Sequence, residues 1–298
     1  MEDKDQRKAY VFAIIAVLIW STVASAFKLS LRYVDHIQLL FYAALVTVVV
    51  LFAVLVLQKK LHLLRDYTWK EYLRSAVMGL VNPFLYYLVL FKAYSLLQAQ
   101  EAQPLNYTWP IWLVLLSIPF LKQKIKALSV VAILISFCGV VMIATGGRLS
   151  GLGFDEPWGI LLGLGSAVIW ASFWIMNLRD GRDEVAKLFL NFCFGTVYIF
   201  IVLVMFSDPI VVSRWGLAGM AYVGLFEMGI TFLLWSMALR LSKNTARISN
   251  LIYLTPFVSL VIIYFFVGES IYVSTMVGLV LIVEGIVIQR LTDRKKSN

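Results

Sequence analysis

The sequence predicts an all-α membrane protein, and three observations lead to that class. Of its 298 residues, 61% are hydrophobic and only 14% are charged, whereas soluble domains carry about a quarter charged residues. The apolar residues fall into runs that reach the roughly 20 helical residues needed to cross a bilayer. Because backbone inside a membrane must satisfy its own hydrogen bonds, runs of this length predict helices.

Ten segments reach the spanning length, and the fourth is the least regular because it opens with polar residues and carries Pro104 and Pro110. The predicted spans are Tyr10–Phe27, His36–Leu57, Ser75–Leu96, Ala102–Leu121, Leu128–Thr145, Trp158–Met176, Leu188–Phe206, Leu217–Leu239, Ile248–Val267 and Tyr272–Gln289.

The orientation follows from the basic residues of the connecting segments. Segments on the side of both termini hold 21 of the 26 Lys and Arg residues, and the opposite segments hold five. The positive-inside rule therefore predicts cytoplasmic termini, and the basic net charge indicates topology rather than nucleic-acid binding. Ala24-Ser25-Ala26 is similar to a signal-peptide cleavage site. Cleavage there would leave nine spans and overturn this charge pattern, so we expect the first helix to stay.

Five pairs of landmarks recur at a nearly constant offset, which indicates duplication of a five-helix unit. They are Trp20 with Trp170, Gly79 with Gly224, Ala93 with Ala238, Tyr107-x-x-Pro110 with Tyr253-x-x-Pro256, and Gly139 with Gly285, at offsets of 145 to 150. The predicted units are 9–146 and 157–291, with cytoplasmic tails 1–8 and 292–298. An odd number of helices gives the two units opposite orientations. Inverted-topology repeats around a central midplane site are typical of secondary transporters.

The Ile-Trp-Ser and Ile-Trp-Ala motifs at Trp20 and Trp170, the two Tyr-x-x-Pro motifs and the five-plus-five layout resemble the drug/metabolite transporter superfamily. Within it the chain is most similar to the ten-helix EamA-type transporters, over nearly its whole length. The resemblance implies a cavity through which amino acids, purines, amines or drug-like compounds are exported or exchanged. The sugar-phosphate and nucleotide-sugar antiporters share the layout and stay open as an alternative.

Glu227 is the deepest acid, about ten residues or roughly 15 Å from either end of its span. Ionisable groups at such depth are costly and default to functional candidates. Asn82 lies at the equivalent position of the first unit. Tyr86 follows Asn82 by four residues, and Thr231 and Trp235 follow Glu227 by four and eight, so each set shares a helix face. We expect these faces to line one substrate cavity; the alternative for Glu227 and Asn82 is a buried structural role.

The entry to the fourth span is the most polar stretch inside the predicted membrane region. Gln103, Asn106 and Tyr107 accompany its prolines there, where freed carbonyls and polar side chains are available to a substrate. Tyr253 occupies the equivalent place in the second unit.

The roles of two other charged residues in the predicted membrane region are less specific. Lys92 either pairs with Glu101 across the following turn, next to the substrate site, or extends to the interface. Glu284 is expected to have a structural or interfacial role.

Deep tryptophans are the remaining binding candidates. Trp20 and Trp170 recur in both units, and Trp174 follows one turn beyond Trp170. Their rings suit flat or apolar substrates and can attract amines through cation–π contacts. Core packing is an equally good explanation for any single one.

Other chemistries lack their residues. His36 and His62 are isolated, and Cys138 and Cys193 read as buried free thiols, so no metal, cofactor or catalytic site is expected. A channel is disfavoured because polar groups occur singly in two unlike copies. We therefore expect a multi-pass carrier of the bacterial inner or plasma membrane, with a small-molecule substrate and protons as the candidate coupling ion. Monomer and homodimer stay open.

Overall fold

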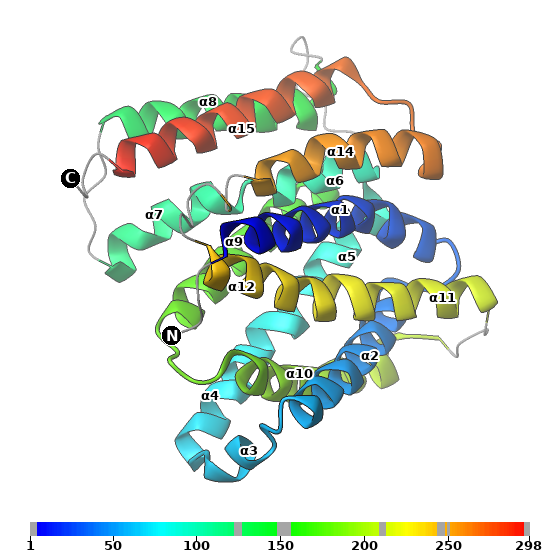
Figure 1. Cartoon of the computed structure of the whole chain (residues 1–298). Helices are drawn as coiled ribbons and strands as arrows, with labels where there is room; N and C mark the ends of the chain where they lie inside the picture. The colour runs from blue at the N-terminus through cyan, green and yellow to red at the C-terminus, as the bar shows by residue number, and fades with distance from the viewer. Residues whose placement is uncertain are drawn as a thin grey trace.

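The computed structural model describes residues 5–121, 127–147, 156–208, 213–242, 248 and 251–294, and all regular structure within these ranges is helical (Figure 1). The predicted tail residues 1–4 and 295–298 lie outside the described residues.

The first half of the chain contains α1 (Gln6–Ser30), α2 (His36–Leu57), α3 (His62–Asp66), α4 (Trp69–Gly79), η1 (Leu80–Leu85), α5 (Tyr86–Leu96), α6 (Ala99–Asn106), α7 (Trp109–Leu121) and α8 (Ala127–Ala144). The second half contains α9 (Pro157–Leu178), α10 (Glu184–Phe206), α11 (Arg214–Tyr222), η2 (Val223–Ile230), α12 (Thr231–Leu241), η3 (Leu251–Leu254), α14 (Thr255–Ile262), η4 (Ile263–Val267) and α15 (Val273–Arg294).

Six helical stretches of the described chain are long and apolar enough to cross a membrane, and each coincides with a predicted span. They are Gln6–Ser30, His36–Leu57, Trp69–Leu96, Pro157–Asn177, Glu184–Phe206 and Arg214–Leu239. The apolar parts of the predicted fifth, ninth and tenth spans are shorter, at Val130–Ile143, Leu251–Val267 and Val273–Ile288.

The predicted fourth span is not one continuous helix. It divides into α6, which begins at Ala99, and α7, with a break at Tyr107 and Thr108. Pro110 has no N–H to donate to the preceding turn, so it suits the first turn of a new helix better than the interior of a longer one. Sequence reasoning had recognised this span as irregular but had not placed the break.

The third long span of each half contains a wide helical turn near its middle. In the first half η1 joins α4 to α5, and its backbone is extended at Asn82, with φ −147° and ψ 121°. In the second half η2 joins α11 to α12 and stays helical throughout. Both wide turns lie beside a long helix of the other half, η1 against α10 and η2 against α2.

Glycine allows these close approaches. A Cβ on Gly79 would collide with the backbone of Asn191 and Gly195 in α10, and a Cβ on Gly224 would collide with the backbone of Ala43 in α2. The Thr47 hydroxyl, also in α2, donates to the Gly224 carbonyl oxygen at 2.9 Å. Small residues thus let helices of the two halves pack backbone to backbone. In the same way α8 and α15 lie side by side, through Gly139 and Gly278 (Figure 1).

Aspartates at the start of α2 and α10 make a matched pair of contacts. Asp35 caps α2 and accepts a hydrogen bond from Ser207, which follows the last residue of α10, at 2.5 Å. Asp183 caps α10 and accepts one from Lys60, which follows α2, at 2.7 Å. Each capping aspartate is therefore held by a residue within three positions of the end of the partner helix.

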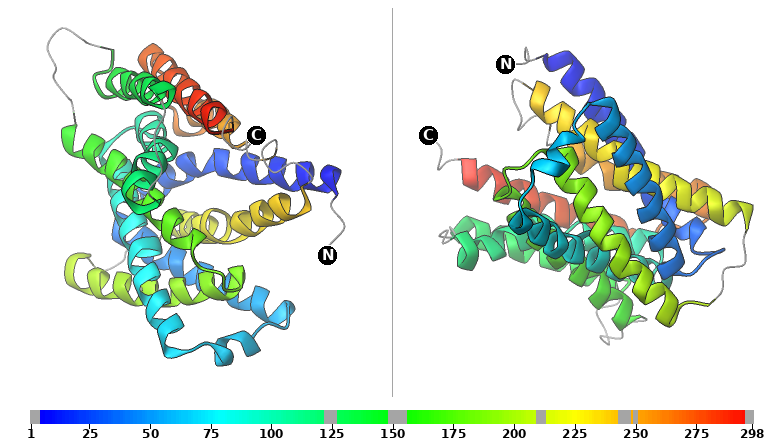
Figure 2. Two further views of the ribbon diagram at one scale, coloured as in Figure 1. Left: turned by 90° about the vertical axis from the view of Figure 1, so that its left-hand side faces the viewer. Right: turned by 90° about the horizontal axis from the view of Figure 1, so that it is seen from below.

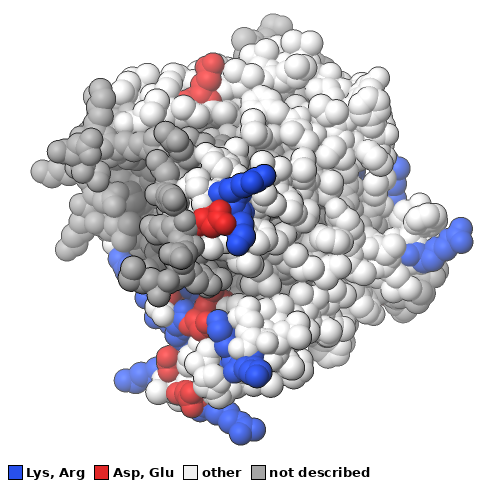
Figure 3. All heavy atoms as spheres, in the orientation of Figure 1, with Lys and Arg blue, Asp and Glu red and all other residues white. Residues whose placement is uncertain are grey.

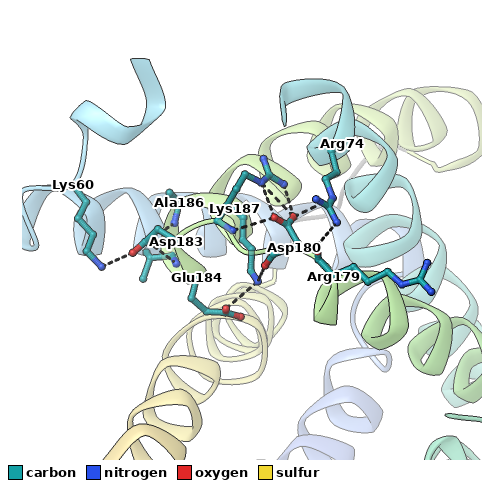
Figure 4. Close-up of polar contacts among 10 residues, drawn as sticks. Lys60, Arg74, Arg179, Asp180, Asp183, Glu184, Ala186 and Lys187 are labelled. Carbon is teal, nitrogen blue, oxygen red and sulfur yellow. Dashed lines mark hydrogen bonds and ion pairs between the residues drawn. The ribbon is translucent and has the colours of Figure 1, made fainter. Parts of the chain in front are cut away.

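A buried ionic network ties the connection between α9 and α10 to α4 (Figure 4). The Asp180 carboxylate pairs with Arg182 at 2.7 Å and Arg74 at 3.5 Å. Arg182 also donates to the Ser75 hydroxyl at 2.9 Å and to the Glu71 carbonyl at 2.8 Å. Burial raises the pKa of Asp180, but hydrogen bonds from Arg182 and the charge of Arg74 outweigh it and hold that pKa below the ordinary value.

Charged and apolar surfaces separate along the molecule. In the view of Figure 3, acidic and basic side chains gather at the centre-left and lower left, a few basic ones lie at the right-hand edge, and most of the described surface between them is uncharged. Large apolar side chains such as Val49, Phe200 and Phe265 are at least half exposed, which suits contact with lipid. Cys138 is exposed as well, so its predicted burial was wrong; it lies on the outer surface of a peripheral helix.

Candidate functional site

A cavity of about 460 Å³ lies between the two halves, within the usual size range of small-molecule sites. In the first half α1, α5, α6 and α7 contribute to its wall, and in the second half α9, η2, α12, η3 and α15 contribute. Figure 2 shows α8 and α15 side by side at one edge of the molecule, and α15 contributes Ile286 to the described wall. The cavity is therefore built by elements far apart in the sequence.

Glu227 lies in η2 and is 9% exposed. One of its carboxylate oxygens, Oε1, accepts a hydrogen bond from the Tyr87 hydroxyl at 3.2 Å. The Trp20 side chain lies beside the same carboxyl group. The second oxygen, Oε2, is buried and has no hydrogen-bond partner among the described residues. Since buried polar groups are nearly always partnered, this oxygen is available to a ligand or a proton.

A continuous series of aromatic rings lines the same cavity as that carboxylate. Tyr86 stacks on Trp170 with ring centroids 4.6 Å apart, and Trp170 contacts both Trp174 and Phe232 at 5.9 Å. Trp20 contacts Phe232 at 5.9 Å and Trp235 at 5.5 Å, so the series runs from Tyr86 to Trp235. Rings from α1, α5, α9 and α12 thus form one aromatic wall.

The polar part of the wall comes from α6. The Asn106 amide donates to the Ser166 hydroxyl of α9 at 2.9 Å, and its oxygen accepts a long hydrogen bond from Tyr86 at 3.4 Å. Gln103 is 4% exposed, and its Oε1 has no hydrogen-bond partner among the described residues. The same holds for the indole nitrogen of Trp174.

Ten of the thirteen predicted site residues line this cavity. They are Trp20, Tyr86, Gln103, Asn106, Tyr107, Trp170, Trp174, Glu227, Trp235 and Tyr253. The structure therefore brings together the candidates that the sequence had selected one helix at a time, whereas Asn82, Thr231 and Lys92 lie elsewhere.

Thr231 is fully buried in packing, and its hydroxyl donates to the Phe226 carbonyl oxygen. The expectation that it shares the Glu227 face assumed 3.6 residues per turn. Because η2 is a π-helix, with about one more residue per turn, Phe232 at i+5 reaches the cavity in its place.

Asn82 is buried in η1, at the level of Glu227 in the repeat, but it is not among the cavity-lining residues. The extended backbone at this residue breaks the helical register that the prediction had assumed. Its Oδ1 has no hydrogen-bond partner among the described residues.

Lys92 lies two residues beyond Leu90 on α5, whose cavity face carries Tyr86, Leu90 and Tyr94 at four-residue spacing. Two residues correspond to about 200° around a helix, so Lys92 is directed away from the cavity. Glu101 instead accepts from the Gln98 backbone nitrogen at 3.1 Å, at the start of α6. The predicted pair between Lys92 and Glu101 is not formed in the described structure.

Sequence reasoning missed several residues of the site. Val23, Ala24 and Phe27 share the Trp20 face of α1 at i+3, i+4 and i+7, a spacing that was readable in advance. Tyr87, which donates to Glu227, was not readable, because it does not follow Asn82 at helical spacing and its contact depends on how the first half packs against η2.

The sequence pattern of the EamA-like transporter family matches residues 7–145 and 157–290, which together make up most of the chain. The chain belongs to the EamA-like transporter family. The expected superfamily is thereby confirmed, and each half of the protein is one EamA unit. This protein is accordingly a transporter rather than an enzyme, and membership implies a membrane and a small-molecule substrate.

The chain is similar to several named transporters, among them the following three. An uncharacterized transporter of Clostridium kluyveri is 23% identical over 98% of this chain and 96% of its own. The uncharacterized inner membrane transporter YhbE of Escherichia coli is 26% identical over 84% of this chain and 78% of its own. The aromatic amino acid exporter YddG of Ancylobacter novellus is 28% identical over 55% of this chain and 58% of its own.

A solved crystal structure of a protein superposes on this EamA-family chain with a TM-score of 0.68, over 99% of this chain and all of the other. The two sequences are 22% identical, so the likeness shows a shared fold.

Proposed function

We propose that this EamA-family protein is a secondary transporter that moves a small metabolite by alternating access, as an exporter or an exchanger. The observation that carries the proposal is the cavity between the two halves, with a buried carboxylate and an aromatic wall. A site walled by both halves changes its access when the halves rock against each other, which is the usual behaviour of repeat-built carriers.

The proposed architecture is ten transmembrane helices in two five-helix repeats of inverted topology, 9–146 and 157–291. Its support is the matched use of equivalent residues. Gly79 packs on α10 as Gly224 packs on α2, and Asp35 meets the end of α10 as Asp183 meets the end of α2. Equivalent residues with exchanged partners are expected from a two-fold axis in the membrane plane.

In this proposal Glu227 is the charged centre of the substrate site, with the aromatic side chains and Gln103 and Asn106 around it. An unpaired anion at this depth is costly, so the carboxylate is neutralised by a proton or by a cationic group of the substrate. Protons are the candidate coupling ion. The aromatic wall suits flat or apolar substrates, in keeping with the aromatic amino acid exporter among the relatives.

The two alternatives fit less well. A sugar phosphate or nucleotide sugar needs cations for its phosphates, and the described lining residues include no Lys or Arg. A channel is expected to carry polar rings along its path, whereas the described cavity is mostly apolar and aromatic.

The test is counterflow into proteoliposomes that contain the purified protein. A labelled panel of amino acids, purines and amines is offered with and without a pH gradient. Saturable uptake that is stimulated by unlabelled substrate inside the vesicles supports a carrier. Flux that rises linearly with concentration, without counterflow, would instead identify a channel.

The proposed location is the bacterial inner or plasma membrane, with both termini in the cytoplasm. A reporter that is active only in the cytoplasm, fused after Asn298, should give a signal. Activity of a periplasmic reporter at the same place would contradict the proposed orientation and the ten-helix topology.

A further inference from the structure

Three buried polar atoms in cavity-lining side chains lack hydrogen-bond partners among the described residues. Two are acceptors, Oε2 of Glu227 and Oε1 of Gln103, and one is a donor, the indole nitrogen of Trp174. An unsatisfied buried polar atom costs free energy, and three in one cavity indicate a ligand that meets them. The surplus is on the acceptor side, so the ligand is expected to be rich in N–H donors.

The charge of the described wall points the same way. Among the described residues that line the cavity, Glu227 is the one with a formal negative charge, and none is Lys, Arg or His. A single carboxylate in a low-dielectric cavity is complemented by one positive charge. A ligand that also carried a carboxylate would bring a second anion beside Glu227 without a cation in the described wall to offset it.

The aromatic wall supplies the remaining recognition. Trp20, Trp170 and Trp235 lie with Tyr86 and Phe232 in one series of ring contacts. Ring faces attract an ammonium group, most strongly once it is desolvated, and they offer apolar area to a flat substituent. A cation seated near Glu227 is therefore held by both the carboxylate and the rings.

We infer that the substrate class of this cavity is monovalent organic cations: a protonated amine on a flat apolar body, without a carboxylate. This inference rests on the proposed transport function and narrows it. Such a substrate differs from an aromatic amino acid by lacking the carboxylate. In the amino acid that carboxylate is an anion, for which the described wall has no positively charged partner.

The test is a matched pair of probes, tryptamine and tryptophan, which share the indole and the amine and differ in the carboxylate. At pH 7 the amine of tryptamine is protonated, as a lysine side chain is. Binding is measured by calorimetry on the full chain in lipid nanodiscs. Tryptamine is expected to bind about tenfold or more tightly than tryptophan, the ratio that follows from one charge-assisted hydrogen bond against one repulsion. Equal or tighter binding of tryptophan would overturn the inference.

A variant pair assigns the effect to the carboxylate. Glu227→Gln keeps size and hydrogen bonding but removes the charge, and it should weaken tryptamine binding about tenfold or more while changing tryptophan binding little. Glu284→Gln is the matched control. Glu284 is a second carboxylate in an apolar helix, but its side chain is exposed and does not line the cavity. Unchanged tryptamine binding in Glu227→Gln would contradict the inference. The comparison of the two probes on the wild-type chain holds even if that variant fails to fold.

Failure of the inference and failure of the proposed function give different results. If neither probe binds but the counterflow panel finds a substrate that is not a cation, the cation class is wrong and the carrier stands. If no compound of the panel shows counterflow, the carrier itself is in doubt.

Discussion

The third span of each half has the same construction and a different outcome. In both, a glycine at the start of a wide turn lies against a helix of the other half, and a polar residue follows three positions later within that turn. In the first half the polar residue is Asn82. Its own backbone is extended, and its side chain is not among those that line the cavity. In the second it is Glu227, on a continuous π-helix that presents it to the cavity. The repeated backbone thus supplies the position, and one residue in one copy supplies the charge.

The spans also differ in what they contact outside their wide turns. The span with Asn82 begins at α4, which the buried Asp180 network fastens to the connection between α9 and α10. The span with Glu227 packs along α1, where Tyr222 and Thr22 share a hydrogen bond of 2.5 Å. The span with Asn82 also meets α1, through the ring contact of Phe91 with Phe27, so the Asp180 network is what distinguishes it, and we call it the anchored span.

The largest expected effect comes from loosening the anchored span. Asp180→Asn leaves Arg182, whose side chain is 6% exposed, without its counter-charge, and a broken buried pair costs about 3–5 kcal/mol. Equilibrium unfolding in mixed micelles measures the loss. Asp5→Asn is the control, because the pair of Asp5 and Lys8 is exposed and exposed ion pairs contribute little to stability.

The same aspartate sets a pH dependence. Its pKa in the folded state lies below the ordinary 3.8, so its stabilising contribution is present above that value and is lost as the pH falls through the lowered pKa. Wild-type protein should therefore lose stability on acidification more steeply than Asp180→Asn. If the stability of the two proteins falls in parallel as the pH is lowered, Asp180 does not anchor the span by its charge.

The next effect probes the shared construction. Gly79→Ala and Gly224→Ala each push a methyl group into the backbone of a helix from the other half, and overpacking costs about 1–3 kcal/mol. Both should unfold at lower denaturant than wild type. Gly165→Ala, where nothing lies within 4 Å of the added carbon, should not. If only one of the first two variants is destabilised, the two spans are not packed alike.

Cavity aromatics should give a moderate change in transport. Trp170→Ala removes the ring that stacks on Tyr86 and contacts Phe232. The loss of this ring's contact with a bound substrate, about 0.5–1.5 kcal/mol, predicts up to about a tenfold fall in uptake at subsaturating substrate. Trp158→Ala, on the same helix but 69% exposed, serves as the control and should transport normally.

The smallest effect is expected at Asn82. Because its side chain does not line the cavity, Asn82→Ala should leave substrate affinity within about twofold of wild type, the small effect typical of substitutions away from a site. The same uptake assay measures it. A loss as large as that of a cavity residue would mean that both copies contribute polar groups to the site.

Span positions were largely predictable because the bilayer dictates long apolar runs, as at His36–Leu57, where the predicted and observed bounds agree. Glu227 was predictable because an acid deep in such a run is rare. The wide turns were not, since a π-turn depends on packing against another helix rather than on local sequence, and this is why Thr231 was chosen in place of Phe232. The direction of Lys92 followed from helix geometry alone and was recoverable from the spacing of Tyr86, Leu90 and Tyr94.

The central claim is that Glu227 is the charged centre of a carrier's substrate site. Its most direct test is counterflow of labelled tryptamine into proteoliposomes preloaded with unlabelled tryptamine, for wild type, Glu227→Gln and Glu284→Gln reconstituted at equal density. We predict saturable counterflow for wild type and Glu284→Gln, and a fall of about tenfold or more for Glu227→Gln. Counterflow of the Glu227→Gln protein at the wild-type rate and affinity would contradict the account.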